Sequence, residues 1–163
     1  MGTSISSSEV CVIGGGVIGL AAAASLHDLG VDVVCFDRSE PGHGQSAGRT
    51  RQFRHLHRAP ELIDLAVRAR QGWLEWERRF GRTLIGSEGA LRVGGQPGEL
   101  EALRAAGVPA VPLDAEQAQA RFAIAALPGG VVLWDPLAGA LRASDSVAAL
   151  SGWIGSAIRR AEV

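Results

Sequence analysis

Three glycines near the start of the 163-residue chain have the spacing of a phosphate-binding turn. Gly14, Gly16 and Gly19 form the pattern G-x-G-x-x-G. The first glycine permits a tight turn, the second lets a diphosphate approach the main chain, and the third lets a helix pack closely on a strand. Unpaired amides at the start of that helix, at Val17 and Ile18, would then face the phosphates. The spacing therefore predicts a dinucleotide site, with a ligand-free tight turn as the alternative.

An acidic residue stands where the ribose of such a ligand would lie. Asp37 follows the β-branched run "VDVVCF" and comes 23 positions after Gly14. A carboxylate at this place accepts hydrogen bonds from both ribose hydroxyls, and it repels a 2′-phosphate. NADP is therefore disfavoured. The glycines and the acid together do not choose between FAD and NAD.

A second group of residues suited to binding anions follows in "RSEPGHGQSAGRTRQFRHLH" (38–57). We expect Ser46 to cap a helix that begins near Ala47, with helical amides directed at an anion. Arg51 and Arg54 are three positions apart and would share one face of that helix. Two guanidinium groups suit a carboxylate, a phosphate or a reduced flavin. A solvated basic helix end is the alternative.

The elements that must position these residues read as strand, helix, strand. A β-rich run (9–13) ends at the glycines, a helical pattern follows up to Gly30, and a second β-rich run covers 31–36. This order is the βαβ unit of a parallel sheet. The predicted fold class is α/β, with a Rossmann-like βαβ in an incomplete parallel sheet and the beginning of a second, mixed α+β domain.

Further elements are expected along the rest of the chain. Residues 59–81 read as a helix with an apolar stripe that starts at Leu62 and includes Ala66. In "DAEQAQARF", Asp114 and Gln117 have the spacing of a reciprocal helix cap. The other expected elements are strands at 83–86 and 90–95, helices at 97–107 and 114–122, a strand and turn at 129–139, and a helix at 144–163.

Composition limits the partners and the compartment. The net charge is −1 and no long charge run occurs, so neither a nucleic acid nor a membrane is expected as a partner. The apolar stretch 12–38 is a poor membrane helix because three consecutive glycines and the pair His27–Asp28 interrupt it. Cys11 and Cys35 lie in apolar runs without metal-ligand spacing, so we expect buried thiols, no metal site and a cytoplasmic location.

The two motifs together resemble a known family. "VIGGGVIGLAAAASL", "FDR" and "SAGRTRQFRH" are similar to the start of the FAD-dependent sarcosine oxidase family, within the D-amino acid oxidase and glycine oxidase superfamily. The resemblance extends to "GALRVGG" and "LWDPLAGALRASDSVAAL". It implies FAD as the cofactor, because an NAD-binding fold usually continues with another βα repeat after the second strand.

The resemblance also implies roles for individual residues. Arg51 would lie near the isoalloxazine ring and stabilise its reduced anion, and Arg54 would pair with a substrate carboxylate. The cofactor-binding residues implied are Gly14, Gly16, Val17, Ile18 and Gly19 at the pyrophosphate, Asp37 at the ribose, Arg38 beside the adenosine, and Ser46 and Thr50 on the flavin side.

The implied activity is oxidation of a C–N bond in a small amino acid or secondary amine. Hydride passes to the flavin, the imine hydrolyses, and O₂ reoxidises the flavin. Two alternatives stay open: a non-catalytic or partner-dependent dinucleotide-binding subunit, and an NAD-dependent dehydrogenase.

The resembled family is more than twice as long as this chain. Residues 1–82 would be a Rossmann-like FAD-binding portion, 83–142 part of a substrate domain, and 143–163 a helix returning to the first portion. We therefore expect a truncated or frameshifted product, one subunit of a larger enzyme, or a compact variant whose sheet is completed by self-association or by a partner chain.

Overall fold

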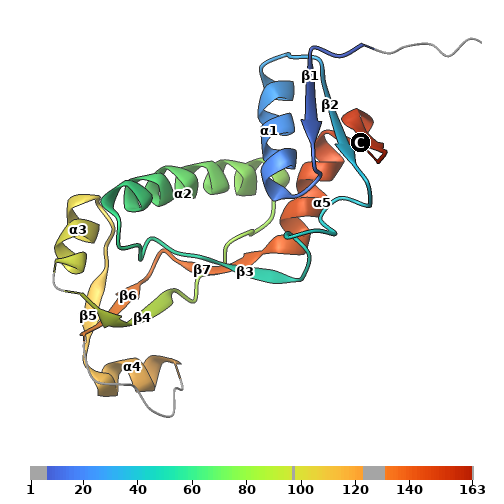
Figure 1. The fold of residues 1–163 in the computed structure, drawn as a ribbon. Coiled ribbons are helices and arrows are strands. Elements are labelled where there is room, and N and C mark those ends of the chain that lie inside the picture. The colour runs from blue at the N-terminus through green and yellow to red at the C-terminus, as the bar shows by residue number, and fades with distance from the viewer. Residues whose placement is uncertain (1–6, 97, 123–130, 163) are drawn as a thin grey trace, which may run out of the picture. The chain divides into compact units, whose positions relative to one another are not determined.

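The predicted strand–helix–strand unit is present in the computed structural model (Figure 1). Strand β1 (Val10–Ile13) leads through the glycine turn into helix α1 (Val17–Asp28), and β2 (Val33–Asp37) follows. The two strands pair in parallel, with Val10 opposite Val33 and Ile13 opposite Phe36. The structure thus confirms the α/β fold class and the βαβ unit.

A third parallel strand corrects the expectation of a helix over 144–163. Helix α5 (Ala143–Trp153) ends early, and a single 3₁₀ turn, η1 (Gly155–Ala157), leads into strand β8 (Ile158–Arg160). Glycines at 152 and 155 weaken helical continuation by about 1 kcal/mol each. Pairing with β2 then favours an extended chain, with Cys35 opposite Ile158. The sheet order is β1-β2-β8.

The structure describes residues 7–96, 98–122 and 131–162, which form two compact units. The first unit combines the chain up to Thr50 with the segment from Arg142 onward, and the second is Arg51–Leu141. The expected functional division at residues 82 and 142 concerns which ligand each portion binds, and it stays a prediction. The expected turn at 129–139 begins outside the described residues, at 129 and 130.

The core of the first unit lies where α1 and α5 pack against each other and α1 packs on β1 and β2. Small side chains make this close approach possible, because Ala23 and Ala24 of α1 have no exposed surface. Leu20 of α1 and Leu150 of α5 are equally buried. The alanine-rich sequence of α1 therefore serves helix–helix and helix–sheet packing rather than membrane insertion.

The second unit is built on a three-stranded antiparallel sheet of order β4-β6-β5. Leu103, Leu133 and Ile63 are almost completely buried in its core. Asp114 and Gln117 form the predicted reciprocal cap, because each backbone amide donates to the other side chain. Apart from the end residues Thr50 and Arg142, which belong to the first unit, the unit contains the elements β3 (Thr50–Phe53), α2 (Pro60–Phe80), β4 (Ala90–Gly95), α3 (Glu99–Ala105), β5 (Val111–Leu113), α4 (Ala115–Phe122), β6 (Val131–Asp135) and β7 (Gly139–Arg142).

Two expectations about the second unit are wrong in detail. The apolar stripe of α2 buries Ile63 and Ala66, whereas Leu62 is 47% exposed. Residues 83–86 do not form a strand: Ile85 makes a single bridge to Leu141. The amides of Leu84 and Ile85 donate instead to Glu77 Oε1, so a side chain replaces the strand partner.

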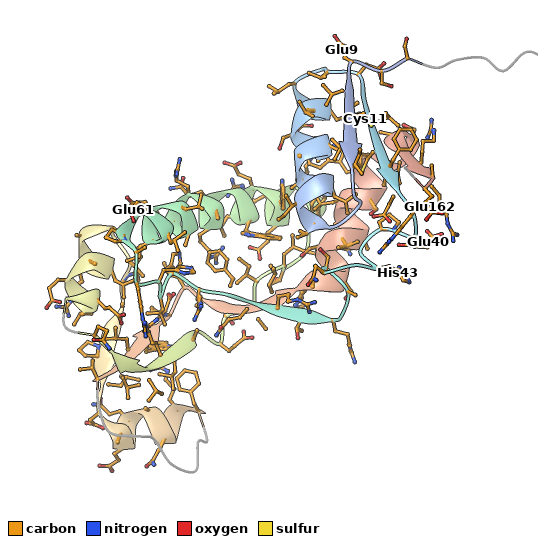
Figure 2. The ribbon with its side chains drawn as sticks, viewed as in Figure 1. Glu9, Cys11, Glu40, His43, Glu61 and Glu162 are labelled. Carbon is orange, nitrogen blue, oxygen red and sulfur yellow. The ribbon has the colours of Figure 1, made fainter. Side chains whose placement is uncertain are left out.

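The cysteines divide between surface and core. Cys35 on β2 is buried, as expected, but Cys11 on β1 is exposed, because alternate residues of a strand face opposite sides of the sheet (Figure 2). Neither forms a disulfide. Within the described ranges, no helix has the length and apolar character needed to cross a bilayer.

Candidate dinucleotide site

The turn between β1 and α1 depends on its first glycine. Gly14 has a φ of 106°, a conformation that L side chains rarely adopt, and its amide still pairs with Phe36 O at 2.7 Å. Gly16 then stands at the helix N-cap with no side chain of its own to cap the helix. The first turn of any α-helix leaves amides without helical partners, and Ile18 in that turn is 83% exposed. This end of α1 is therefore open to an anion.

The other glycines of the turn leave room for named neighbours. A Cβ on Gly19 would overlap the carbonyl oxygen of Gly14, so this glycine sets the closeness of helix and strand. A Cβ on Gly15 would lie 3.0 Å from Asp37 Oδ2, and one on Gly16 would lie 3.1 Å from Ser46 Oγ. Two of the predicted ligand-binding side chains thus already contact the main chain of the turn.

Asp37, at the end of β2, is held by the chain itself. Its Oδ2 accepts a hydrogen bond from the Gly15 amide at 2.5 Å, and its Oδ1 accepts from the Ser39 amide at 2.8 Å and the Ser39 hydroxyl at 3.1 Å. The Ser39 amide is the main cause that holds the pKa of Asp37 below its usual range; partial desolvation opposes it, and Gly15, the Ser39 hydroxyl and Arg38 add to it. The carboxylate is ionised at neutral pH and fixed beside the glycine turn.

A cavity of about 260 Å³ opens beside Asp37. The segment directly after β8 forms part of its wall, because the Ala161 amide donates to Asp37 O at 2.9 Å and so places residues 161 and 162 at the rim. The sequence prediction missed this contribution, because 158–163 was expected to be helical. The lining residues are Ile13, Gly14, Phe36, Asp37, Arg38, Ala161 and Glu162.

Ser46 has a capping role, but for a different helix from the one predicted. Its hydroxyl accepts a hydrogen bond from the Val17 amide at 2.9 Å, so it caps α1 from 29 residues away. No helix begins at Ala47, because Gly48 has a φ of 107° and the chain then extends into β3. Ser46 therefore lies at the N-terminal end of α1.

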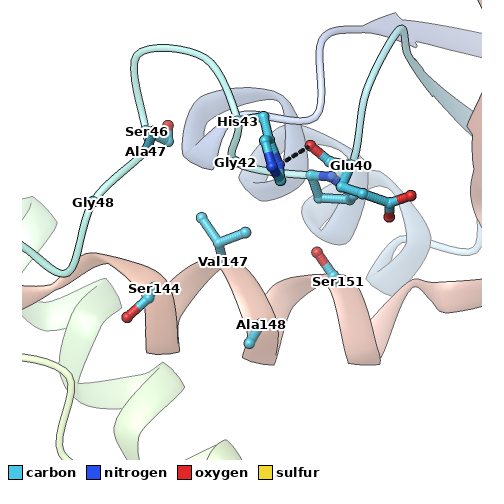
Figure 3. A pocket seen from close by; sticks show the side chains of 11 residues that line it. Glu40, Gly42, His43, Ser46, Ala47, Gly48, Ser144, Val147, Ala148 and Ser151 are labelled. Atoms are coloured by element: carbon cyan, nitrogen blue, oxygen red, sulfur yellow. Dashed lines mark hydrogen bonds between the residues drawn. The ribbon is translucent and has the colours of Figure 1, made fainter.

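The loop that carries Ser46 is fixed between the glycine turn and α5. The Gly42 amide donates to Gly15 O at 2.9 Å, and a Cβ on Gly42 would press on Val147 of α5. Figure 3 shows Val147 directed at this loop, and His43 Nδ1 lies 3.2 Å from Glu40 O. A cavity of about 420 Å³ remains between the loop and α5. These contacts fix the position of Ser46 without a ligand.

The two predicted catalytic arginines do not share a helical face. Thr50, Arg51 and Phe53 belong to β3, which pairs with β7, and Arg54 follows directly after the strand. Thr50 is the last residue of the first unit's N-terminal segment, whereas Arg51 and Arg54 belong to the second unit. Both arginines are exposed. Among the described residues, no carboxylate forms an ion pair with Arg54.

Sequence reasoning missed two members of the site. Gly15 holds Asp37 through its amide, and Ser39 holds the other carboxylate oxygen. A signal for each existed: Gly15 completes a run of three glycines, and Ser39 lies two residues after the acid, the spacing of an Asx turn. No group of three or more His, Cys, Asp or Glu side chains among the described residues could hold a metal ion.

A parallel βαβ unit with a glycine turn, an open helix N-terminus and a fixed acid defines a dinucleotide-binding α/β protein. Comparison with known families is more specific. The chain belongs to the FAD dependent oxidoreductase family, which it matches over residues 9–157. The family's dependence on FAD favours this cofactor over the NAD alternative.

Curated relatives lie within the same group of enzymes. The chain is 33% identical over 89 residues to a monomeric sarcosine oxidase from Bacillus sp. (strain B-0618), a match that covers 53% of this chain and 23% of the relative. It is 40% identical over 52 residues to a D-amino acid dehydrogenase from Helicobacter pylori, covering 32% of this chain and 13% of the relative. The matched region is thus a minor part of each relative.

Solved structures share the fold over nearly the whole chain. NikD, an unusual amino acid oxidase essential for nikkomycin biosynthesis, superposes with a TM-score of 0.77 at 26% identity, covering 95% of this chain and 43% of NikD. L-proline dehydrogenase from P. horikoshii superposes with a TM-score of 0.81 at 20% identity, covering 96% of this chain and 45% of that protein, and it supports the fold alone. The chain spans less than half the length of these structures.

Proposed function

We propose that the first unit binds the ADP half of FAD and that the protein is an oxidase of a small amino acid or secondary amine. The observation that carries the proposal is the fixed Asp37 carboxylate, which joins the glycine turn to a cavity at the carboxyl ends of β1 and β2. Carboxyl ends of parallel strands are where nucleotides bind in such sheets.

The residues around the turn have the chemistry that the ADP half of the cofactor requires. The pyrophosphate would lie against Gly14, Gly16, Val17, Ile18 and Gly19, where the positive end of α1 favours negative charge. The Val17 amide already donates to Ser46, so the amide of Ile18, in the first turn of α1, is the better phosphate donor. Asp37 would accept the ribose hydroxyls, and Arg38 would lie beside the adenosine.

The flavin side and the substrate are assigned from the family resemblance. Ser46 and Thr50 would face the flavin side, and Arg51 would stabilise negative charge on the reduced ring. Arg54 would bind the carboxylate of the substrate, which orients the neighbouring carbon and nitrogen. When bound, FAD supplies the two-electron acceptor that a C–N oxidation requires.

The cofactor proposal is tested by adding FAD to the purified chain, removing the excess, and recording flavin absorption. A yellow protein that retains FAD is expected. A colourless protein that gains no flavin band would contradict the proposal.

The substrate proposal is tested with Arg54→Met. We expect the KM for amines that bear a carboxylate to rise about 10- to 100-fold, the equivalent of one hydrogen bond to a charged group. Arg104→Met, which removes an exposed arginine from α3, is the matched control and should leave KM unchanged. An unchanged KM for Arg54→Met would show that the assigned role is wrong.

A second candidate function is an activity that depends on self-association or on a partner chain. One observation favours it. Ile13 on β1 is 70% exposed and Cys11 on the same strand is also exposed, so the described residues leave this face of β1 uncovered. Self-association or a partner chain would cover it. Analytical ultracentrifugation should then detect a dimer, which Ile13→Lys should dissociate. We also propose a cytoplasmic location, which the two free cysteines support.

A further inference from the structure

A buried histidine–aspartate pair lies directly beside Arg54. His55 is 2% exposed and Asp135, at the end of β6, is 0% exposed, although the two are 80 positions apart. Asp135 Oδ2 accepts two hydrogen bonds from His55, one from its amide at 2.8 Å and one from ring Nδ1 at 3.0 Å. Asp135 Oδ1 accepts a third from the Leu137 amide at 3.1 Å. Both carboxylate oxygens are therefore satisfied inside the second unit.

Burial of this carboxylate is unfavourable unless its partners stay in place. Desolvation raises the pKa of Asp135, but hydrogen bonds from the His55 ring and amide outweigh it, so the net pKa lies below the usual range. An ionised, fully buried carboxylate that loses its partner costs several kcal/mol in typical proteins. The pair therefore holds the main chain at His55 in one position.

The residue before Arg54 is fixed as well. Phe53 is 8% exposed, and its ring meets the His55 ring edge to face with centroids 5.1 Å apart. Arg54 thus stands between two anchored residues while its own side chain reaches solvent. Alternation along an extended chain directs its side chain away from the two buried rings.

We propose that His55 and Asp135 are positioning residues that aim the Arg54 guanidinium at the substrate carboxylate. The inference rests on the proposed role of Arg54. The pair makes no contact with substrate: it acts by keeping the main chain between Phe53 and His55 in one conformation, which lowers the entropy lost when Arg54 engages an anion.

The test compares two substitutions of similar polarity. His55→Asn keeps an N–H where Nδ1 stands and can still donate to Asp135, whereas the longer amide of His55→Gln displaces it. The full chain loaded with FAD is titrated with sarcosine and, as a matched amine without a carboxylate, with N-ethylmethylamine. Binding is followed without oxygen as a change in the flavin spectrum, so the readout does not require turnover.

We expect His55→Gln to weaken sarcosine binding about 5- to 10-fold, His55→Asn to bind it within about twofold of the wild type, and both to bind N-ethylmethylamine and FAD normally. Equal sarcosine affinity in the two variants, either unchanged or weakened, would overturn the inference. So would an equal loss for N-ethylmethylamine.

A different result would contradict the proposed role of Arg54 itself. If Arg54→Met leaves sarcosine affinity unchanged, the carboxylate role of Arg54 is wrong whatever the His55 variants do. Should His55→Gln not fold, NMR relaxation of the backbone amides of Arg54 and His55 in the wild-type protein tests the inference instead. Order parameters near 0.85 would support the inference, and values below about 0.6 would overturn it.

Discussion

Replacing Asp37 by asparagine should loosen the glycine turn before any ligand is present. The amide keeps one oxygen, which can still accept from Ser39, but it places an NH₂ group against the Gly15 amide, where Oδ2 accepts a hydrogen bond at 2.5 Å in the wild type. A hydrogen bond to a charged group contributes about 1.5–3 kcal/mol. Because solvent reaches this half-buried carboxylate, we expect the lower end of that range, a loss of about 1.5 kcal/mol.

The expected loss has a characteristic pH dependence. Asp37 has a depressed pKa in the folded protein, so its ionised form stabilises the fold above the unfolded-state pKa of about 3.9. That contribution is lost as the pH falls through the folded pKa, because the protonated acid then resembles the amide. The stability difference between wild type and Asp37→Asn should therefore be full at neutral pH and shrink toward zero in acid.

Urea unfolding followed by circular dichroism at neutral and acid pH measures this difference. At neutral pH, a loss of about 1.5 kcal/mol corresponds to a fall in Tm of about 3–6 °C for a chain of this size. Ser39→Ala is the matched control: it removes the 3.1 Å bond from the hydroxyl to Asp37, together with a long 3.5 Å bond to Glu40 O, and should cost less. A variant as stable as wild type at neutral pH, or a difference that persists unchanged in acid, would refute the reasoning.

Two further substitutions test the geometry of the turn. Ser46→Ala removes the acceptor of the Val17 amide and should lower the free energy of unfolding by about 1 kcal/mol. Ser144→Ala, at an exposed residue of α5, is the control and should leave the melting temperature unchanged. Equal effects of the two substitutions would argue against the cap. Gly19→Ala places a Cβ on the Gly14 carbonyl and should cost about 1–3 kcal/mol in urea unfolding. Gly72→Ala, in open space within α2, should instead stabilise by about 0.5–1 kcal/mol, and a similar gain for Gly19→Ala would contradict the close packing.

The glycine turn and the acid could be predicted because their signals are local. A strand that turns this tightly into a helix requires a positive φ at the turn, which Gly14 adopts. Asp37 ends a run of β-branched residues, and such a run is visible in the sequence alone. The capping tendency of Ser46 was also visible. Its partner was not, because Val17 lies 29 residues away and only the folded loop brings the two together.

The segments that were predicted wrongly are those where distant pairing overrides local pattern. Arg51 and Arg54 have helical spacing, but pairing of β3 with β7 makes that stretch extended. Ile158 fits an apolar helical stripe, yet it pairs with Cys35 as a strand. In α2, apolar residues occupy both 62 and 63, so periodicity alone could not choose which of them is buried.

The order of β1-β2-β8 has a consequence for synthesis. β2 ends at Asp37 and β8 begins at Ile158, 121 positions later (158 − 37). At about 5–20 residues per second, a ribosome would complete β2 some 6–24 seconds before its neighbour. During that interval β2 is an unpaired edge that can recruit a strand from another nascent chain. Strands β4, β5 and β6 all lie between β2 and β8 in the chain, so their antiparallel sheet can pair before the parallel sheet gains its third strand.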